Sequence, residues 1–199
     1  MTLDATQLKH AITRVCVGLH AAAPELNTLD GRLGDGDLGA TLDKCAAEVE
    51  AALPHMSDTL TDVFRRAALG CANASGSSFG TLLAQALLTA AKQSEQLVEL
   101  TREDVVSLIR RITDVLSARG GAKLGDKTVL DALNAVGDAL GAASAADAWK
   151  GVACSAIEET LSEFRGRPNR IGRARMFAER SAGQDDPGMV ALLRMAQSI

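Results

Sequence analysis

Aromatic side chains are scarce in this sequence. It contains no Tyr, one Trp and four Phe among 199 residues. Because strands favour aromatic and β-branched residues, this composition argues against a β-rich fold. Ala and Leu dominate instead, and both are good helix formers. Apolar residues make up 47% of the chain, which is enough for a sizeable core, and we expect a single domain over 1–199.

Long apolar runs and an excess of positive charge are also missing. No stretch approaches the roughly 18 apolar residues of a membrane span. The net charge is -4, so no overall positive field attracts nucleic acid. The first seven residues lack the basic start and apolar run of a secretory signal. We therefore expect a cytoplasmic protein that has neither nucleic acid nor a membrane as its partner.

Cysteine and histidine do not form a recognisable centre. The four cysteines are Cys16, Cys45, Cys71 and Cys154. Their spacing fits neither a zinc site nor a Cys-x-x-Cys pair. Three of them sit within apolar helical stretches, and we interpret these as buried thiols. The three histidines have no motif around them and are interpreted as surface or helix-end residues. The chemistry of this chain must therefore come from other residue types.

Helical periodicity recurs along the chain. Leu8, Ile12, Val15 and Leu19 lie on one face of a first helix over 4–22, and Pro24 predicts its end. Further helices are expected at about 38–53, 59–70, 81–92, 102–119, 128–141, 144–165 and 189–196. No segment has a convincing strand pattern. The sequence therefore predicts an all-α fold with eight amphipathic helices that run up and down.

The segment 30–39 holds three aspartates and four glycines. Gly disfavours a helix interior by about 1 kcal/mol, so we expect a loop that gathers Asp30, Asp35 and Asp37. At ~4 Å, each carboxylate pair repels by about 1 kcal/mol in water and about 4 kcal/mol near a protein surface. A hard cation relieves this repulsion, and Mg²⁺ combines one or two carboxylates with phosphate oxygens. The segment predicts a Mg²⁺ site for a phosphorylated ligand; the alternative is an acidic turn.

Two further loops contain small or basic residues. Residues 73–80 are mostly small or hydroxylic and precede a helix, which suits either an anion site at a helix N-terminus or a Ser-capped helix start. Residues 121–128 nearly match a phosphate loop, but Asp126 separates Gly125 from Lys127, so we reject that motif. Lys123 or Lys127 could still bind phosphate, or the loop could simply be solvated.

The segment 165–180 is basic. It carries Arg165, Arg167, Arg170, Arg173, Arg175 and Arg180. Guanidinium groups suit phosphate recognition, and the alternative is a basic surface that offsets nearby acidic residues. In an up-and-down bundle alternate loops lie at the same end. The acidic loop, the Ser/Gly turn, the Gly-Lys loop and the Arg-rich segment should therefore converge on one rim and form one site.

Together these blocks resemble the L-subunit family of dihydroxyacetone kinases, the nucleotide-binding part. The matching blocks are 29–30, 34–39, 74–76, 121–131, 172–174, 179–181 and 186–188. They occur in the order of the family and cover most of the chain. The combination is specific, whereas no single block would be.

The resemblance implies a barrel of eight antiparallel helices with ADP or ATP at one end. It implies two Mg²⁺ ions held by Asp30, Asp35 and Asp37, which together with Arg180 would be the catalytic residues. The implied nucleotide-binding residues are Leu38, Gly39, Thr41, Ser75, Gly76, Gly121, Val129, Arg180, Asp186, Pro187 and Gly188.

The resemblance also implies a reaction, in which a phosphoryl group passes to a small keto-triose or related polyol held by a separate substrate-binding (K-type) subunit. Position 38 is Leu, where members coupled to a phosphotransferase system often carry His and members that use ATP often carry Cys or Thr. The donor, ATP or a phosphohistidine protein, therefore stays open. The alternatives are a non-catalytic nucleotide- or phospholipid-binding regulatory module and an inert helical scaffold.

Overall fold

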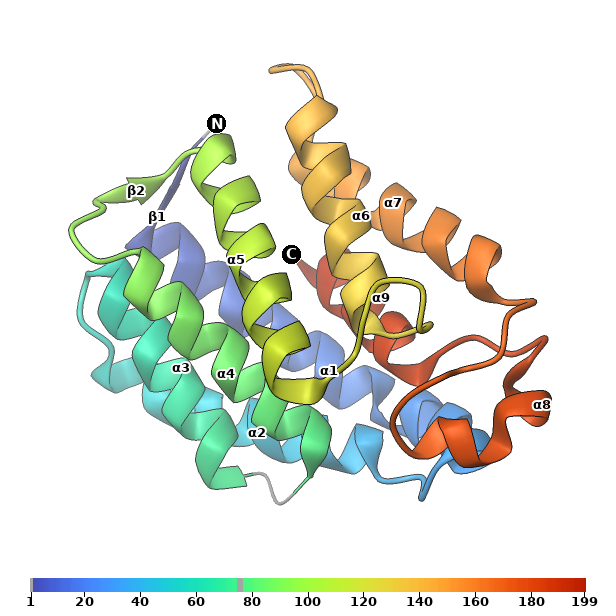
Figure 1. Ribbon diagram of the computed structural model, residues 1–199. Coiled ribbons are helices and arrows are strands. Elements are labelled where there is room, and N and C mark those ends of the chain that lie inside the picture. Colours follow the sequence, from blue (N-terminus) through green and yellow to red (C-terminus); the bar gives the residue numbers. More distant parts are fainter. Residues whose placement is uncertain (1, 75–76) are drawn as a thin grey trace.

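The computed structural model describes residues 2–74 and 77–199 (Figure 1). The predicted nucleotide contacts of Ser75 and Gly76 lie outside the described residues. The described part contains nine α-helices, two 3-10 helices and two strands of two residues each. The all-α prediction is confirmed.

Eight of these helices are long enough to build the body of the molecule. They are α1 (Ala5–Leu33), α2 (Leu38–Ala52), α3 (Leu60–Ala74), α4 (Ser78–Gln93), α5 (Arg102–Gly120), α6 (Val129–Ala142), α7 (Trp149–Phe164) and α9 (Pro187–Ser198). The short elements are α8 (Ala178–Ser181), the 3-10 helices η1 (Leu53–His55) and η2 (Arg173–Phe177), and the strands β1 (Leu3–Asp4) and β2 (Glu99–Leu100). The two strands pair antiparallel.

The first helix corrects two expectations. α1 continues through Pro24 to Leu33, so the proline does not end it and Asp30 belongs to its last turn rather than to a loop. Leu26 and Leu33, beyond the proline, are 0% and 1% exposed. Burying each leucine gains about 1.5–3 kcal/mol, which together outweighs the roughly 3 kcal/mol cost of an interior proline. Tertiary packing therefore extends the helix.

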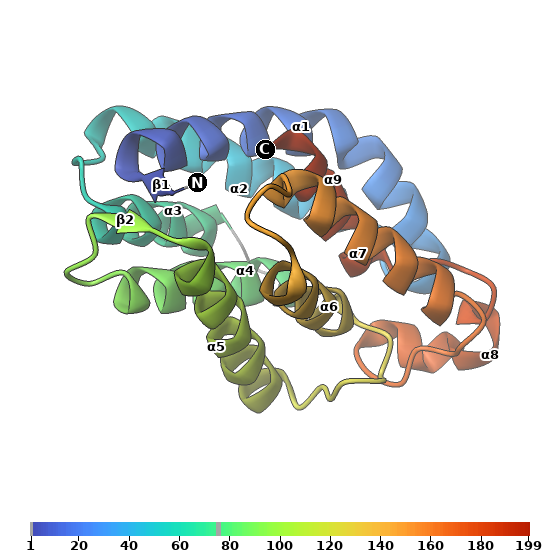
Figure 2. The same cartoon turned by 90° about the horizontal axis from the view of Figure 1, so that it is seen from above.

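The long helices pack in the order of the chain. Contacts join each helix from α1 to α7 to the next, α7 then packs against α9, and α9 packs against α1. Figure 2 shows α9 between α1 and α7. One large apolar cluster lies among them and includes the fully buried Leu42, Leu60, Val63 and Met189. The C-terminal helix is thereby fixed beside the N-terminal one.

Helix caps set where the elements begin and end near the loops. The Thr101 hydroxyl accepts the Asp104 N–H, which confirms the predicted cap of α5. Thr128 caps α6, and Asp186 caps α9.

α7 begins at Trp149, later than the predicted residue 144. Among the described residues, no helix is both long and apolar enough for a membrane crossing.

Candidate functional site

A cleft of about 640 Å³ opens where four polar segments meet. Its walls come from the α1–α2 connection, the start of α4, the α5–α6 loop and the segment between α7 and α9. The lining polar and glycine residues include Asp30, Asp35, Asp37, Ser77, Thr81, Gly120, Thr128, Gly172, Arg173, Asp186 and Gly188. The alternate loops thus converge as the helix count predicted.

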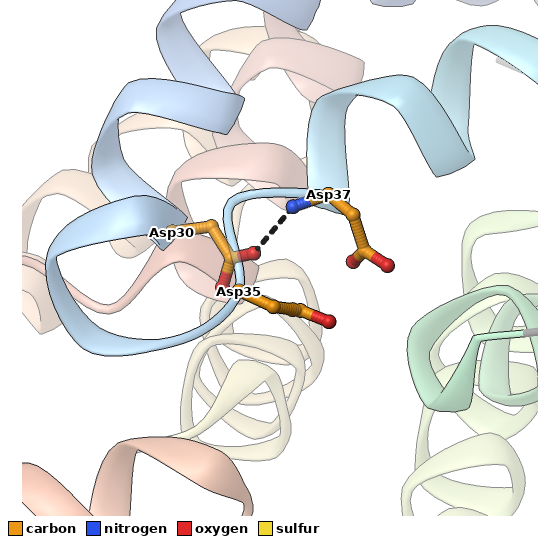
Figure 3. Close-up of side chains that lie close together, drawn as sticks. All are labelled: Asp30, Asp35 and Asp37. Carbon is orange, nitrogen blue, oxygen red and sulfur yellow. Dashed lines mark hydrogen bonds between the residues drawn. The ribbon is translucent and has the colours of Figure 1, made fainter.

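The three aspartates lie together at this cleft (Figure 3). One carboxylate oxygen from each of Asp30, Asp35 and Asp37 lies within 4.8 Å of the others. Asp30 is half-buried in the last turn of α1, and the other two are exposed. Its Oδ2 accepts the Asp37 N–H at 3.0 Å and the Leu38 N–H at 3.3 Å. These bonds fix the Asp30 carboxylate and close the turn that presents the other two.

Arg173 is the cationic side chain that the structure adds to this cluster. It lies at the start of η2, lines the cleft, and its Nη1 contacts Asp35 Oδ2. The side chain of Arg173 is 63% exposed, so it can reorient. The sequence singled out the arginine-rich segment but named Arg180 as the site residue. Arg180 stacks over the Phe177 ring and is not part of the cleft wall.

Four helix N-termini face the same cleft. The lining includes residues from the first turns of α2, α4, α6 and α9, among them Leu38, Phe79, Val129 and Pro187. Each helix N-terminus carries about +0.5 of a charge, and the first-turn N–H groups that the side-chain caps leave free are available to a ligand. Their convergence favours an anion, and phosphate is the anion that helix N-termini commonly bind. The cleft thus places helix ends that suit an anion beside carboxylates that suit a cation.

The remaining wall is apolar. Leu82, Leu116, Leu130 and Ile171 line it, and they belong to a second apolar cluster beside the main core. A flat apolar group such as a nucleotide base suits this surface. The sequence did not single out these residues, because an apolar residue that faces a ligand has the same periodicity as one that faces the core.

Besides Arg180, three predicted nucleotide-binding residues do not line the cleft. Gly39 packs against α1, where an added Cβ would lie 2.0 Å from the Ala23 carbonyl oxygen. Thr41 is buried, and its N–H donates to the Asp37 carbonyl. Gly121 ends α5 in a left-handed conformation with φ of 69°. Each of these residues shapes an element that borders the cleft.

The three predicted residues at the start of α9 do line the cleft. The Asp186 carboxylate accepts the Met189 N–H at 3.0 Å and the Asn169 side-chain N–H at 2.8 Å. Burial raises the pKa of Asp186 to about 6, although these hydrogen bonds and the nearby Lys127 ammonium oppose the rise. Gly188 packs close to Phe79 and Val129, where a Cβ would be crowded.

The phosphate role considered for Lys127 is wrong. Its side chain is 1% exposed, and its ammonium donates to the carbonyl oxygens of Arg165, Arg167, Ser181 and Gln184 at 2.7–3.3 Å. The ammonium is therefore committed to the protein backbone. Lys123 is exposed and is not part of the cleft lining.

Arginines of the basic segment also have local partners. Arg165 forms a bidentate ion pair with Asp185 at 2.8 and 3.0 Å. Arg167 pairs with Glu163 and lies over the Phe164 ring. Of the six arginines, Arg173 is the one that lines the cleft. The segment thus contributes two surface ion pairs and one arginine at the cleft.

Comparison with known proteins shows the family. Residues 32–199 match the DAK2 domain. The whole chain is 28% identical to the ADP-binding subunit DhaL of the PEP-dependent dihydroxyacetone kinase of Escherichia coli K12 and covers 97% of it. It is 34% identical, over 95% of its length, to the D-erythrulose kinase of Mycolicibacterium smegmatis, of which it covers 34%.

The fold has solved counterparts as well. The native dihydroxyacetone kinase of C. freundii superposes with a TM-score of 0.77 at 23% identity, over 97% of this chain and 34% of that one. The same kinase in complex with AMP-PNP and Mg²⁺ gives a TM-score of 0.74. The chain thus spans nearly all of the E. coli DhaL subunit and about a third of the larger kinases. It belongs to the DAK2 domain family.

Proposed function

We propose that this protein is the nucleotide-binding subunit of a dihydroxyacetone-type kinase, a phosphotransferase that works with a substrate-binding partner subunit. The observation that carries the proposal is the cleft itself, where three carboxylates, four helix N-termini and Arg173 face one space. Membership of the DAK2 family and similarity to subunits named as ADP-binding support it. The bound nucleotide would be ADP or ATP.

The carboxylate cluster fits Mg²⁺. Oxygens that share one Mg²⁺ at about 2.0–2.1 Å lie roughly 3–4 Å apart, so the 4.8 Å spread among Asp30, Asp35 and Asp37 needs only a small closing movement. Three carboxylates with phosphate oxygens offer enough ligands for the two ions that the resemblance implies. When bound, Mg²⁺ would neutralise and align the terminal phosphates.

The residues of the chain supply positioning and charge. The amides at the starts of α2 and α4 would hold phosphate oxygens, and the apolar wall formed by Leu82, Leu116 and Leu130 would hold the base. Arg173 would move from Asp35 to the phosphates and stabilise the charge that spreads over the transferring group. Arg180 was the arginine expected for that role, and its place outside the cleft favours Arg173.

The acceptor would come from a partner. The described residues that line the cleft include no histidine and no side chain arranged to capture a sugar covalently. A K-type subunit would therefore hold the keto-triose or related polyol. The donor would be ATP or a phosphohistidine protein, and the apolar Leu38 matches neither family pattern.

The helix contacts that return from α9 to α1 support an eight-helix barrel as one domain over 1–199. We place the protein in the cytoplasm.

Calorimetry tests the nucleotide site. We expect Mg·ADP to bind the wild-type protein and its affinity to fall at least a hundredfold in Asp35→Asn and in Asp37→Asn, because each change removes a metal ligand. Asp58→Asn is the matched control, since Asp58 is an exposed carboxylate paired with Lys9 away from the cleft. Equal affinity in all four proteins would overturn the site.

A coupled assay tests the kinase. We expect phosphoryl transfer to dihydroxyacetone or erythrulose when a substrate-binding subunit and either ATP or a charged phosphohistidine protein are added. Nucleotide binding without transfer in every combination would favour the non-catalytic regulatory module. Tightly retained ADP in the purified protein would indicate that the nucleotide is a fixed cofactor, whereas exchange of ATP in each turnover would indicate a direct donor.

A further inference from the structure

Lys127 is a buried charge that the proposed chemistry does not use. It lies between the α5–α6 loop and the start of α6, with φ of 62°. Non-glycine residues rarely adopt this left-handed region, and they persist there when the surroundings impose it. The side chain is 1% exposed and, among the described residues, is the largest side chain that is fully buried. A position of this kind needs a strong local interaction to hold it.

That interaction is a cage of backbone carbonyls. Lys127 Nζ lies 2.8 Å from the carbonyl oxygens of Arg167 and Ser181, 2.7 Å from that of Gln184 and 3.3 Å from that of Arg165. An ammonium has three N–H donors, so the four acceptors use all of them. Burial lowers the pKa of Lys127, while the charges of Asp186 and Asp185 oppose this change. The four carbonyls come from both ends of the segment 165–184, and one cation holds the two ends together.

A second layer of hydrogen bonds joins this cage to the start of α9. The Asn169 side chain donates to the Lys127 carbonyl oxygen and to Asp186 Oδ2, both at 2.8 Å. The Asn169 N–H donates to Ser181 Oγ at 2.8 Å. Asn169 is 2% exposed and Ser181 is 0% exposed. This buried network leads directly to the residue that caps α9 beside the cleft.

The network underlies three parts of the cleft wall. Lys127 precedes Thr128 and Val129, the segment it closes carries Gly172 and Arg173, and Asn169 holds Asp186. Of these parts, η2 contains no buried residue, so it lacks apolar anchors of its own. A fixed position for Arg173 therefore depends on how the ends of its segment are held.

We infer that Lys127 is a positioning residue, a tethered cation that closes the segment 165–184 against the start of α6 and thereby sets the Arg173 and Asp186 side of the nucleotide cleft. It acts through the backbone and does not touch the nucleotide. The inference rests on the proposed function for its effect on the nucleotide, whereas its effect on the segment does not depend on any ligand.

Limited proteolysis of the ligand-free, full-length chain tests the effect on the segment. Trypsin cuts after arginine, and Arg170, Arg173, Arg175 and Arg180 are all exposed within the closed segment. In Lys127→Met, which keeps the length and the apolar stem but removes the charge, we expect native-state cleavage within 170–180 to accelerate at least tenfold. Lys9→Met is the matched control, because Lys9 also bridges two segments through a carbonyl oxygen and a carboxylate, on Met56 and Asp58.

Calorimetry with Mg·ADP tests the effect on the cleft. We expect the affinity of Lys127→Met to fall at least tenfold and that of Lys9→Met to stay within twofold of wild type, with both variants measured well below their melting temperatures. Faster cleavage with unchanged affinity would mean that the cleft does not depend on the segment. Unchanged cleavage would overturn the inference itself. If the wild type binds no Mg·ADP, the proposed function fails while the proteolysis result still decides the role of Lys127.

A milder variant covers the case in which Lys127→Met does not fold. Ser181→Ala removes the hydroxyl that accepts the Asn169 N–H and donates to the Ala178 carbonyl at 2.6 Å, and it leaves the cation in place. We expect faster cleavage within 170–180 by threefold or more, with the helical signal of the whole chain unchanged. A folded Ser181→Ala protein with wild-type cleavage would count against the network.

Discussion

At the scale of single residues, two arginines of the same basic segment differ in whether they line the cleft. Arg173 and Arg180 belong to the same basic segment, but one contacts Asp35 and the other covers an aromatic ring. Guanidinium groups stabilise phosphate when they reach it with their N–H fork. The backbone position of each arginine decides whether its guanidinium group can reach a phosphate in the cleft.

The two arginines therefore give a direct comparison. We expect Arg173→Ala to weaken Mg·ADP binding about tenfold or more, because it removes the cation that we propose contacts the phosphates. Arg180→Ala should change the affinity by less than threefold. Isothermal titration of both variants measures this, and a larger loss in Arg180→Ala would restore the residue that the sequence favoured.

Gly39 allows α2 to pack closely against α1, because it has no side chain. A Cβ at this position would lie 2.0 Å from the Ala23 carbonyl oxygen in α1. We expect Gly39→Ala to lower the free energy of unfolding by about 1–3 kcal/mol, as overpacking does in cores. Gly151→Ala is the control, because no heavy atom lies within 4 Å of its added Cβ, and it should raise helix stability by about 0.5–1 kcal/mol. Urea denaturation distinguishes the two.

At the scale of elements, packing and several polar contacts hold α1 and α2 together, and one group of these contacts centres on a titratable histidine. His20 of α1 lies 2.7 Å from Asp43 and 3.3 Å from Glu50, both on α2. The hydrogen bond with Asp43, followed by that with Glu50, raises the pKa of His20 against the opposing effect of burial. The folded state therefore binds this proton more tightly than the unfolded state.

The sign of the pH dependence follows from that pKa. The stabilisation is fully present below the unfolded pKa of about 6.5 and is lost as the pH rises through the higher folded pKa. We expect His20→Gln to lower the free energy of unfolding by about 0.2–1 kcal/mol at pH 5.5, the range of exposed pairs, and by less at pH 8.5. Denaturation at the two pH values measures this, with the exposed His10→Gln as control; an equal loss at both values would contradict it.

At the scale of the whole molecule, the cleft collects walls from distant parts of the chain. The last turn of α1, the start of α4, the α5–α6 loop and the start of α9 all contribute. A ligand that binds such a site contacts only the folded state, so its binding free energy adds to the free energy of unfolding.

Thermal denaturation should therefore respond to the ligand. At a hundredfold excess of Mg·ADP over Kd the gain is about 2.7 kcal/mol, which corresponds to an increase in Tm of roughly 5–10 °C for a domain of this size. We expect EDTA to abolish most of this increase and Asp35→Asn to lack it. If Mg·ADP leaves the Tm unchanged, the result would support the hypothesis of an inert helical scaffold.

Much of the fold and part of the site were predictable because their causes are local. Apolar periodicity set the helices, and Thr101 capped α5 as predicted. The count of long helices placed alternate loops at one rim. The three aspartates are close in sequence, and the short turn between α1 and α2 leaves their carboxylates little room to separate.

What the tertiary structure decided depends on neighbours that are distant in sequence. α1 passes Pro24 because Leu26 and Leu33 are buried by other helices. Lys127 turns inward because carbonyls 38 to 57 residues away surround its ammonium. Arg173 reaches the acidic turn because its segment brings it to Asp35. The sequence by itself determined the all-α architecture and the acidic centre, since both follow from local spacing. Burial and long-range contacts determined which cations serve the cleft and which hold the chain together.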